Sequence, residues 1–275
     1  MNGKELSEAL RSGRRVYGSC VTSTAPGWPS MIASTGVDMA FIDTEHTPID
    51  RAQLSWICRT YTGLGVAPVV RVPQADPILA CMVLDGGAAG VVAPYIENAE
   101  QVRQLRGAVK LRPLKGERLQ NVLAGTEQLN EENAAYLGAR AANCALIINI
   151  ESVPAVNRLD EILAVPGLDG VLIGPHDLSI SLDLPEEYTH PKFLEAVSTI
   201  IKKCRAANVG VGIHFFDDIN QEIDWAKEGA NLIMHSTDVF LCREILSTAL
   251  AQIRRELGDA EKTLSTRQPS QEEII

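Results

Sequence analysis

Short apolar runs recur along the chain and alternate with segments of helical periodicity. Most runs are nearly continuous stretches of Val, Ile, Leu and Ala, which is typical of parallel strands covered on both faces. Eight strands are predicted, at residues 16–22, 39–46, 68–73, 90–96, 145–152, 170–175, 210–216 and 232–239. Several of the helical segments between them end in Gly, a common helix stop. Strand and helix alternating eight times in 275 residues predict an α/β fold, specifically a (β/α)8 barrel.

An open, doubly wound sheet is the alternative arrangement of the same elements. A dinucleotide-binding sheet of that kind needs a GxGxxG motif after the first strand, and the chain has none there. We therefore expect one barrel domain at residues 1–258, followed by a polar, aperiodic tail at residues 259–275. The connection at residues 97–144 is unusually long, and such insertions usually cover the active face of a barrel.

Composition excludes some classes of partner. The net charge is −10, which disfavours a nucleic-acid partner because such proteins need a basic face. No apolar run approaches the roughly 20 residues of a membrane span, and the N-terminus lacks the apolar core of a signal peptide. The six cysteines show no CxxC or zinc-type spacing and are expected to be buried free thiols. A reduced, soluble, cytoplasmic protein is therefore expected.

Ionisable side chains gather where the predicted strands end. The strand-end residues are Asp43, Glu45, His46, Arg71, Glu151 and Asp177, and the last two strands contain His214 and His235. Because the C-terminal ends of barrel strands meet at one mouth, these side chains are expected to lie together. Taken singly, Asp177 or Glu151 could cap a helix, and Arg71 could be a structural ion-pair partner. Together they favour a functional site.

The stretch GVLIGPHDLS, residues 170–179, ends a buried strand with an ionisable pair. A buried charge is costly unless it is paired or bound to a metal. Glu151 and Asp177 end adjacent strands, and two close carboxylates repel each other unless a cation lies between them. An oxygen-only ligand set favours a hard divalent ion such as Mg²⁺ or Mn²⁺. The bend at Gly174 and Pro175 is expected to turn backbone N–H groups towards an anion beside the metal.

Four blocks of sequence resemble a known family. The runs FIDTEHTPID, VVRVPQADP, LDGGAAGVVAPYIENAEQ and IESVPAVNRLDEILAVPGLDGVLIGPHDLSISL are similar to those of the HpcH/HpaI aldolases, over roughly residues 3–250. This family contains metal-dependent class II pyruvate aldolases of the 2,4-dihydroxyhept-2-ene-1,7-dioate and 2-keto-3-deoxyglucarate aldolase type. The resemblance implies a barrel of the phosphoenolpyruvate/pyruvate-binding type. It also implies a lyase that cleaves a 4-hydroxy-2-oxo acid to pyruvate and an aldehyde through a metal-stabilised pyruvate enolate.

The resemblance also assigns catalytic roles to individual residues. Glu151 and Asp177 match the metal ligands, and Arg71 matches the residue that contacts the pyruvyl carbonyl oxygen. The base that moves the proton of the aldol hydroxyl matches His46. The two catalytic carboxylates that accompany the base are Asp43, beside it in sequence, and Asp85 of the LDGGA run, as its partner.

The substrate pocket departs from the family pattern. Asn149 stands where the family usually has Gln, and His176 replaces a small residue or Asn. The family's PPxGxRG turn appears as PLKGERL, at residues 113–119. The residues expected to bind substrate are Arg71, Asn149, Gly174, Pro175 and His176. Because the changes fall in parts expected to shape the acceptor pocket, the resemblance does not identify the acceptor aldehyde.

Assembly and metal choice follow from the resemblance as well. Family barrels exchange their last helix between subunits, in homo-oligomers that are often hexameric. The segment FLCREILSTALAQIRREL supplies an apolar stripe suited to such docking, formed by Leu241, Ile245, Leu246, Leu250 and Ile253. The cofactor is expected to be Mg²⁺ or Mn²⁺, with Co²⁺ or Zn²⁺ as alternatives. The small-molecule partners are pyruvate and an aldehyde.

Rival functions remain open at this point. Schiff-base chemistry needs a lysine, and no predicted strand ends in one. A phosphate-binding barrel would show glycine-rich turns after strands seven and eight, which HFFDDIN and HSTDVF lack. A CoA-dependent C–C lyase of the citrate lyase β-subunit type would need a basic surface for the nucleotide, which this acidic chain disfavours. A non-catalytic metal-binding barrel is the remaining alternative.

Overall fold

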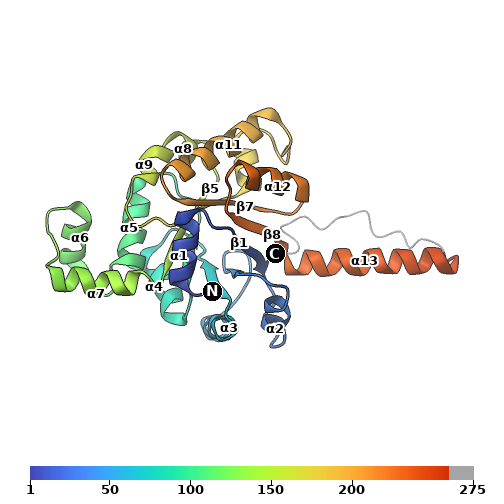
Figure 1. Ribbon diagram of the computed structural model, residues 1–275, viewed down its shortest axis with the longest axis horizontal. Helices are drawn as coiled ribbons and strands as arrows, with labels where there is room; N and C mark the ends of the chain where they lie inside the picture. Colours follow the sequence, from blue (N-terminus) through green and yellow to red (C-terminus); the bar gives the residue numbers. More distant parts are fainter. Residues whose placement is uncertain (260–275) are drawn as a thin grey trace.

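Eight parallel strands close into a barrel in the computed structural model, which describes residues 1–259 (Figure 1). The strands are β1 (Val16–Val21), β2 (Met39–Asp43), β3 (Ala67–Arg71), β4 (Gly90–Ala93), β5 (Ala145–Ile150), β6 (Gly170–Ile173), β7 (Gly210–Phe215) and β8 (Leu232–Thr237). Each strand pairs in parallel with the next, and β8 returns to β1. The predicted (β/α)8 barrel is confirmed, with each strand where an apolar run predicted it.

Helices surround the barrel and occupy the connections between strands (Figure 1). They are α1 (Gly3–Ser12), α2 (Trp28–Ala33), α3 (Arg51–Gly63), α4 (Pro77–Gly86), α5 (Ala99–Lys110), α6 (Gly116–Ala124), α7 (Glu131–Ala141), α8 (Val153–Asn157), α9 (Leu159–Leu163), α10 (Pro175–Ser181), α11 (Pro191–Ala206), α12 (Ile219–Glu228) and α13 (Asp238–Leu257). Capping boxes begin α3 at Asp50 and α5 at Asn98. These caps satisfy free N–H groups in the first turn and so fix where each helix starts.

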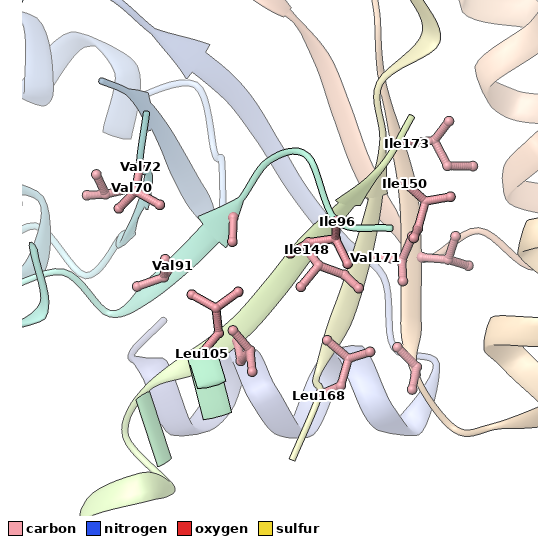
Figure 2. Packing of buried hydrophobic residues seen from close by; sticks show 14 of the residues in the cluster. Val70, Val72, Val91, Ile96, Leu105, Ile148, Ile150, Leu168, Val171 and Ile173 are labelled. Carbon is pink, nitrogen blue, oxygen red and sulfur yellow. The ribbon is translucent and has the colours of Figure 1, made fainter. Parts of the chain in front are cut away.

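Strand pleating sorts the apolar side chains into two cores. In β2, Met39 and Phe41 belong to the core inside the barrel, whereas Ala40 and Ile42 belong to the layer between strands and helices. Figure 2 shows part of that outer layer, where Leu105 of α5 lies near the strands. Side chains along a strand point alternately into the barrel and towards the helices. Two residues beyond the last inner-core side chain of a strand, the next inward-facing side chain therefore lies at the mouth.

The same alternation selects the side chains that face the mouth. Inward positions continue from Phe41 to Asp43 in β2, and from Val69 to Arg71 in β3. In β5 the inward positions continue from Ile147, in the inner core, to Asn149. The strands therefore place polar side chains directly above the apolar filling of the barrel.

A buried ion-pair network ties the opposite end of the barrel together. Asp169, which precedes β6, is fully buried and accepts a hydrogen bond from the backbone N–H of Leu146 at 2.8 Å. Its carboxylate lies 2.6 Å from Lys110 Nζ and 3.2 Å from Arg11 Nε. The network joins α1 and α5 to the start of β6.

Replacing Asp169 with alanine is expected to lower the free energy of unfolding by about 3 kcal/mol, because it leaves Lys110 charged and unpaired in a buried position. Asp160→Ala is the matched control, since Asp160 pairs with Lys203 at 2.8 Å but is 77% exposed. Such a surface pair contributes at most about 1 kcal/mol. Denaturant unfolding measures both variants. Equal losses would show that burial does not distinguish the two pairs.

The long connection between β4 and β5 does not cover the mouth. It forms α5, α6 and α7, and α6 and α7 extend to one side of the barrel (Figure 1). None of the residues that line the mouth cavity comes from 97–144. The expectation that this insertion covers the active face was therefore wrong for a single chain. So was the expectation that the PLKGERL departures, at residues 113–119, shape the acceptor pocket.

The last helix, α13, projects away from the barrel (Figure 1). Its exposed apolar side chains are Ile245, Leu246, Leu250, Ile253 and Leu257. Among the helices described, none is both long and apolar enough to cross a membrane. The predicted polar tail at 259–275 falls, apart from its first residue, outside the described residues. All six cysteines are free, and four are buried, whereas Cys81 is half-buried and Cys242 is exposed.

Candidate active site

A cavity of about 530 Å³ opens at the C-terminal ends of the strands. Nine of the ten residues predicted for the site line it: Asp43, His46, Arg71, Asn149, Glu151, Gly174, Pro175, His176 and Asp177. They belong to β2, β3 and β5 and to the segments that directly follow β2, β5 and β6. Their convergence follows from the barrel topology, because parallel strands bring their C-terminal ends to one mouth.

Arg71 is held by two carboxylates. Its Nε and Nη2 donate to the two oxygens of Asp43 at 2.8 and 2.6 Å, and Nε also lies 3.1 Å from Glu45 Oε2. Burial raises the pKa of Asp43, but hydrogen bonds and charge from Arg71 outweigh it and hold this pKa below its ordinary value. The guanidinium also lies over the Phe41 ring, 5.5 Å from its centroid. The arginine is therefore fixed in place, with Nη1 free of hydrogen bonds to the described residues.

Glu151 is a buried carboxylate at the end of β5. Its oxygens accept hydrogen bonds from the backbone N–H of Tyr95 at 2.7 Å and from Asn149 Nδ2 at 2.9 Å. Burial is the main reason that the pKa of Glu151 is raised, and the negative charges of Asp177 and Glu45 raise it further. A cation beside this group would relieve the repulsion.

The carboxylate pair fits a divalent metal ion. An ideal Cβ built on Gly174 would lie 2.8 Å from Glu151 Oε2 and 3.7 Å from Asp177 Oδ2, so both carboxylates border the space that this glycine leaves. The Oδ1 atom of Asn149 is buried nearby and has no hydrogen-bond partner among the described residues. No group of three or more metal-binding side chains occurs within residues 1–259. Two carboxylates suit Mg²⁺, which usually keeps water and ligand oxygens in its other positions.

His46 lies at the rim of the cavity. Its side chain is 49% exposed, and its Nε2 lies 3.7 Å from Glu45 Oε2. Within one chain, Glu45 is therefore the carboxylate beside the imidazole. Glu45 also contacts Arg71, so the three side chains form a linked group of charges at the rim.

Asp85 does not join this site within one chain. It lies in the last turn of α4, where its carboxylate is 78% exposed and pairs with Arg112 at 2.8 Å. It borders a separate groove between α3 and α4. A helix that follows a strand starts at the mouth and runs back along the barrel, so its last turn is carried away from the mouth. The predicted contact between Asp85 and His46 is not formed in the single chain.

Eight further residues line the cavity, namely Cys20, Phe41, Glu45, Tyr95, Leu172, Glu186, His214 and Phe216. Tyr95 follows β4 with φ of 58°, and its hydrogen bond with Glu45 is the main reason that the Tyr95 pKa is raised. The position of Tyr95 just after a strand was a usable signal, whereas its left-handed backbone was not visible in the sequence. Glu45 and His214 were already expected near the mouth from their places in the predicted strands, but no role was assigned to either.

The chain matches a family model and many known proteins. The model described as HpcH/HpaI aldolase/citrate lyase matches residues 20–244. The 2-keto-3-deoxy-L-rhamnonate aldolase of Escherichia coli (strain K12) is 32% identical over 251 residues, which cover 90% of this chain and 92% of that protein. An HpcH/HpaI aldolase from Desulfitobacterium hafniense DCB-2 is 27% identical, with a TM-score of 0.78 over 90% of this chain and 96% of that chain. The citrate synthase SbnG is 26% identical, with a TM-score of 0.77 and coverages of 92% and 99%.

Proposed function

Because this chain belongs to the HpcH/HpaI aldolase/citrate lyase family, we propose that the cavity at the barrel mouth is its active site. The chain is a class II pyruvate aldolase, a carbon–carbon lyase that cleaves a 4-hydroxy-2-oxo acid to pyruvate and an aldehyde. The aldolase relatives favour this activity over a CoA-dependent lyase or a non-catalytic barrel. One observation carries the assignment of the site: the fixed guanidinium of Arg71 shares the cavity with the carboxylates of Glu151 and Asp177.

Glu151 and Asp177 are proposed to hold the metal ion, which we expect to be Mg²⁺ or Mn²⁺ because the ligands are oxygens. Co²⁺ and Zn²⁺ are the alternatives. When bound, the metal acts as a Lewis acid towards the oxygens of the 2-oxo acid. Asn149 orients Glu151 through its Nδ2, and the bare Cα of Gly174 keeps the space between the carboxylates open.

The remaining polar residues act on the substrate. Arg71 stabilises the negative charge that develops on the C2 oxygen as the C3–C4 bond breaks, and Asp43 holds its guanidinium in place for this role. His46 accepts the proton of the C4 hydroxyl, directly or through one water, as the C4 carbonyl of the aldehyde forms. His176 and Pro175 line the cavity beside Asp177 and are proposed to contact the substrate.

A pyruvate-release assay with a panel of 4-hydroxy-2-oxo acids tests this function. We expect release with added Mg²⁺ or Mn²⁺, loss of release in excess EDTA, and recovery when the metal is restored. Because the metal supplies the Lewis acid, its removal should abolish turnover rather than weaken substrate binding alone. Full activity in EDTA, after verified removal of metal, would contradict the metal mechanism. Absence of release from every acid in the panel would contradict the aldolase assignment.

The working form is proposed to be a homo-oligomer that exchanges α13 between subunits, with a hexamer as the expected assembly. The exposed apolar side chains of α13 and its projection from the barrel support this proposal (Figure 1). Asp85 can be the partner of His46 only across such an interface, because it lies outside the cavity of its own chain. The six free cysteines support a reducing, cytoplasmic setting.

A further inference from the structure

β8 passes directly into α13. The strand ends at Thr237 and the helix begins at Asp238. Just before this joint, Ser236 has φ of 54°, and a left-handed backbone at a non-glycine residue persists only where surrounding contacts enforce it. The direction in which α13 leaves the barrel is therefore set by the contacts of a short segment, residues 236–240, which we call the α13 root.

Asp238 fastens the α13 root to the loop that follows β1. The residue is buried, with 3% of its surface exposed. Its Oδ1 accepts hydrogen bonds from the Thr22 hydroxyl and from the backbone N–H of Val239, both at 2.8 Å. Its Oδ2 accepts from Trp28 Nε1 at 2.7 Å and from the backbone N–H of Ser23 at 3.1 Å. Because a buried carboxylate is costly without such donors, these contacts hold the loop and the helix together.

The α13 root also contacts the wall of the cavity. The carbonyl oxygen of Ser236 lies 3.0 Å from His214 Nε2. The ring of Phe240, in the first turn of α13, stacks on Phe216 with centroids 5.7 Å apart and planes inclined by 8°. His214 and Phe216 both line the cavity. A shift of the root would therefore move two of the side chains that form the cavity wall.

Beyond its first turn, α13 has little to hold it to its own barrel (Figure 1). Asp238 is the one buried residue of this helix, which lies wholly within the described part of the chain. The apolar side chains of Ile245 and Leu246 are exposed. Under the exchange proposed above, docking on a second copy of the chain buries this apolar stripe and fixes the direction of the helix. The root is then the point at which docking acts on the cavity.

We propose that Asp238 is a positioning residue, which makes the order of the β1–α2 loop and of the cavity wall depend on the docking of α13 on a neighbouring subunit. This inference rests on the proposed aldolase function and on the proposed exchange of α13. It is separate from the role proposed for Asp85, which would reach His46 directly across the interface.

Hydrogen–deuterium exchange of the β1–α2 loop tests the contact itself. Both oxygens of Asp238 accept from N–H or O–H groups, so the NH₂ group of Asp238→Asn meets a donor in either orientation. The Thr22 and Ser23 amides should exchange faster by about tenfold or more, as loss of a hydrogen bond to a charged group predicts. Trp28→Phe removes one donor and should give a smaller increase. Asp218→Asn is the matched control and should leave the loop unchanged, because Asp218 caps α12 at an exposed position and asparagine caps equally well.

Leu246→Asp tests the link between docking and the loop. It places a charge in the apolar stripe without touching the root, so light scattering should show a smaller assembly. The loop amides should then exchange faster than in the wild type. The double variant of Asp238→Asn and Leu246→Asp should lose no more protection than Asp238→Asn alone, because docking acts through a contact that is already lost. A purely structural role of Asp238 would instead give additive losses.

Catalysis is compared among variants that keep the apolar stripe, because loss of assembly would also remove Asp85 from the interface. Asp238→Asn and Phe240→Leu should each lower kcat/KM for pyruvate release by about tenfold. Affinity for Mn²⁺ should stay within about twofold of the wild type, because the root contacts the cavity wall and not the proposed metal ligands.

The outcomes distinguish the levels of the proposal. Wild-type loop exchange in Asp238→Asn, unchanged loop exchange in a dissociated Leu246→Asp, or additive losses in the double variant would each overturn the role of Asp238. So would normal kcat/KM in both Asp238→Asn and Phe240→Leu. A monomeric wild type, or full assembly in Leu246→Asp, would overturn the docking on which the inference rests.

These results leave the aldolase function standing, because exchange of the loop amides and light scattering need no substrate. A wild type with neither pyruvate release nor exchange of the pyruvate methyl protons with D₂O would instead overturn the proposed function itself.

Discussion

Replacing Asp177 with asparagine is expected to reduce pyruvate release by roughly 10³-fold and to weaken Mn²⁺ binding in parallel. Loss of a group that only supports a ligand typically costs 10–100-fold in metal affinity or activity, and loss of a ligand should exceed that range. Asparagine keeps the size of the side chain, so the fold is expected to survive. Titration calorimetry with Mn²⁺ measures the metal, the coupled pyruvate assay measures turnover, and thermal unfolding checks the fold.

Glu151→Gln should show the same pair of losses, because its carboxylate borders the same space beside Gly174. Glu187→Gln is the matched control: this glutamate is exposed and lies outside the cavity, so both metal affinity and turnover should stay within about twofold of the wild type, as surface substitutions usually do. Retention of full Mn²⁺ affinity in both Asp177→Asn and Glu151→Gln would place the metal elsewhere.

The barrel could be predicted from the sequence because its strands are short, nearly continuous apolar runs. The predicted strand ends were less accurate next to the candidate site. The run at 39–46 was predicted as one strand, but β2 ends at Asp43, because the following residues leave the sheet to form the rim of the cavity. The strand ends did predict which side chains lie together, since Glu151 and the other predicted residues apart from Asp85 line one cavity.

The errors arose where sequence position does not fix spatial position. Asp85 follows a strand-end arginine by fourteen residues, and the intervening helix carries it away from the mouth. The connection at 97–144 is long enough to cover the mouth, but its helices pack beside α5 instead. Tyr95 joined the site through a left-handed turn that no local pattern indicated. In each case, packing between distant elements determined the outcome.

His46→Ala is expected to lower the rate of aldol cleavage by roughly 10²–10⁴-fold, the usual effect of losing a general base. Metal affinity should be almost unchanged, because His46 is at the rim and the proposed ligands are Glu151 and Asp177. The decline of rate on the acidic side of the pH profile, where a base becomes protonated, should disappear with the imidazole. His190→Asn, which changes a histidine outside the cavity, should leave both the rate and this decline intact.

The substitution also separates His46 from its neighbours in the linked group of charges. Glu45 contacts both Arg71 and His46, so Glu45→Gln should lower the rate through the arginine as well as through the base, whereas His46→Ala leaves the contact between Arg71 and Asp43 in place. Exchange of pyruvate methyl protons should therefore fall further in Glu45→Gln than in His46→Ala if the C4 hydroxyl is the group from which His46 takes its proton.

Survival of both the cleavage rate and the acidic decline in His46→Ala would mean that another group is the base. His176 would then be the next candidate, because it lines the cavity beside Asp177.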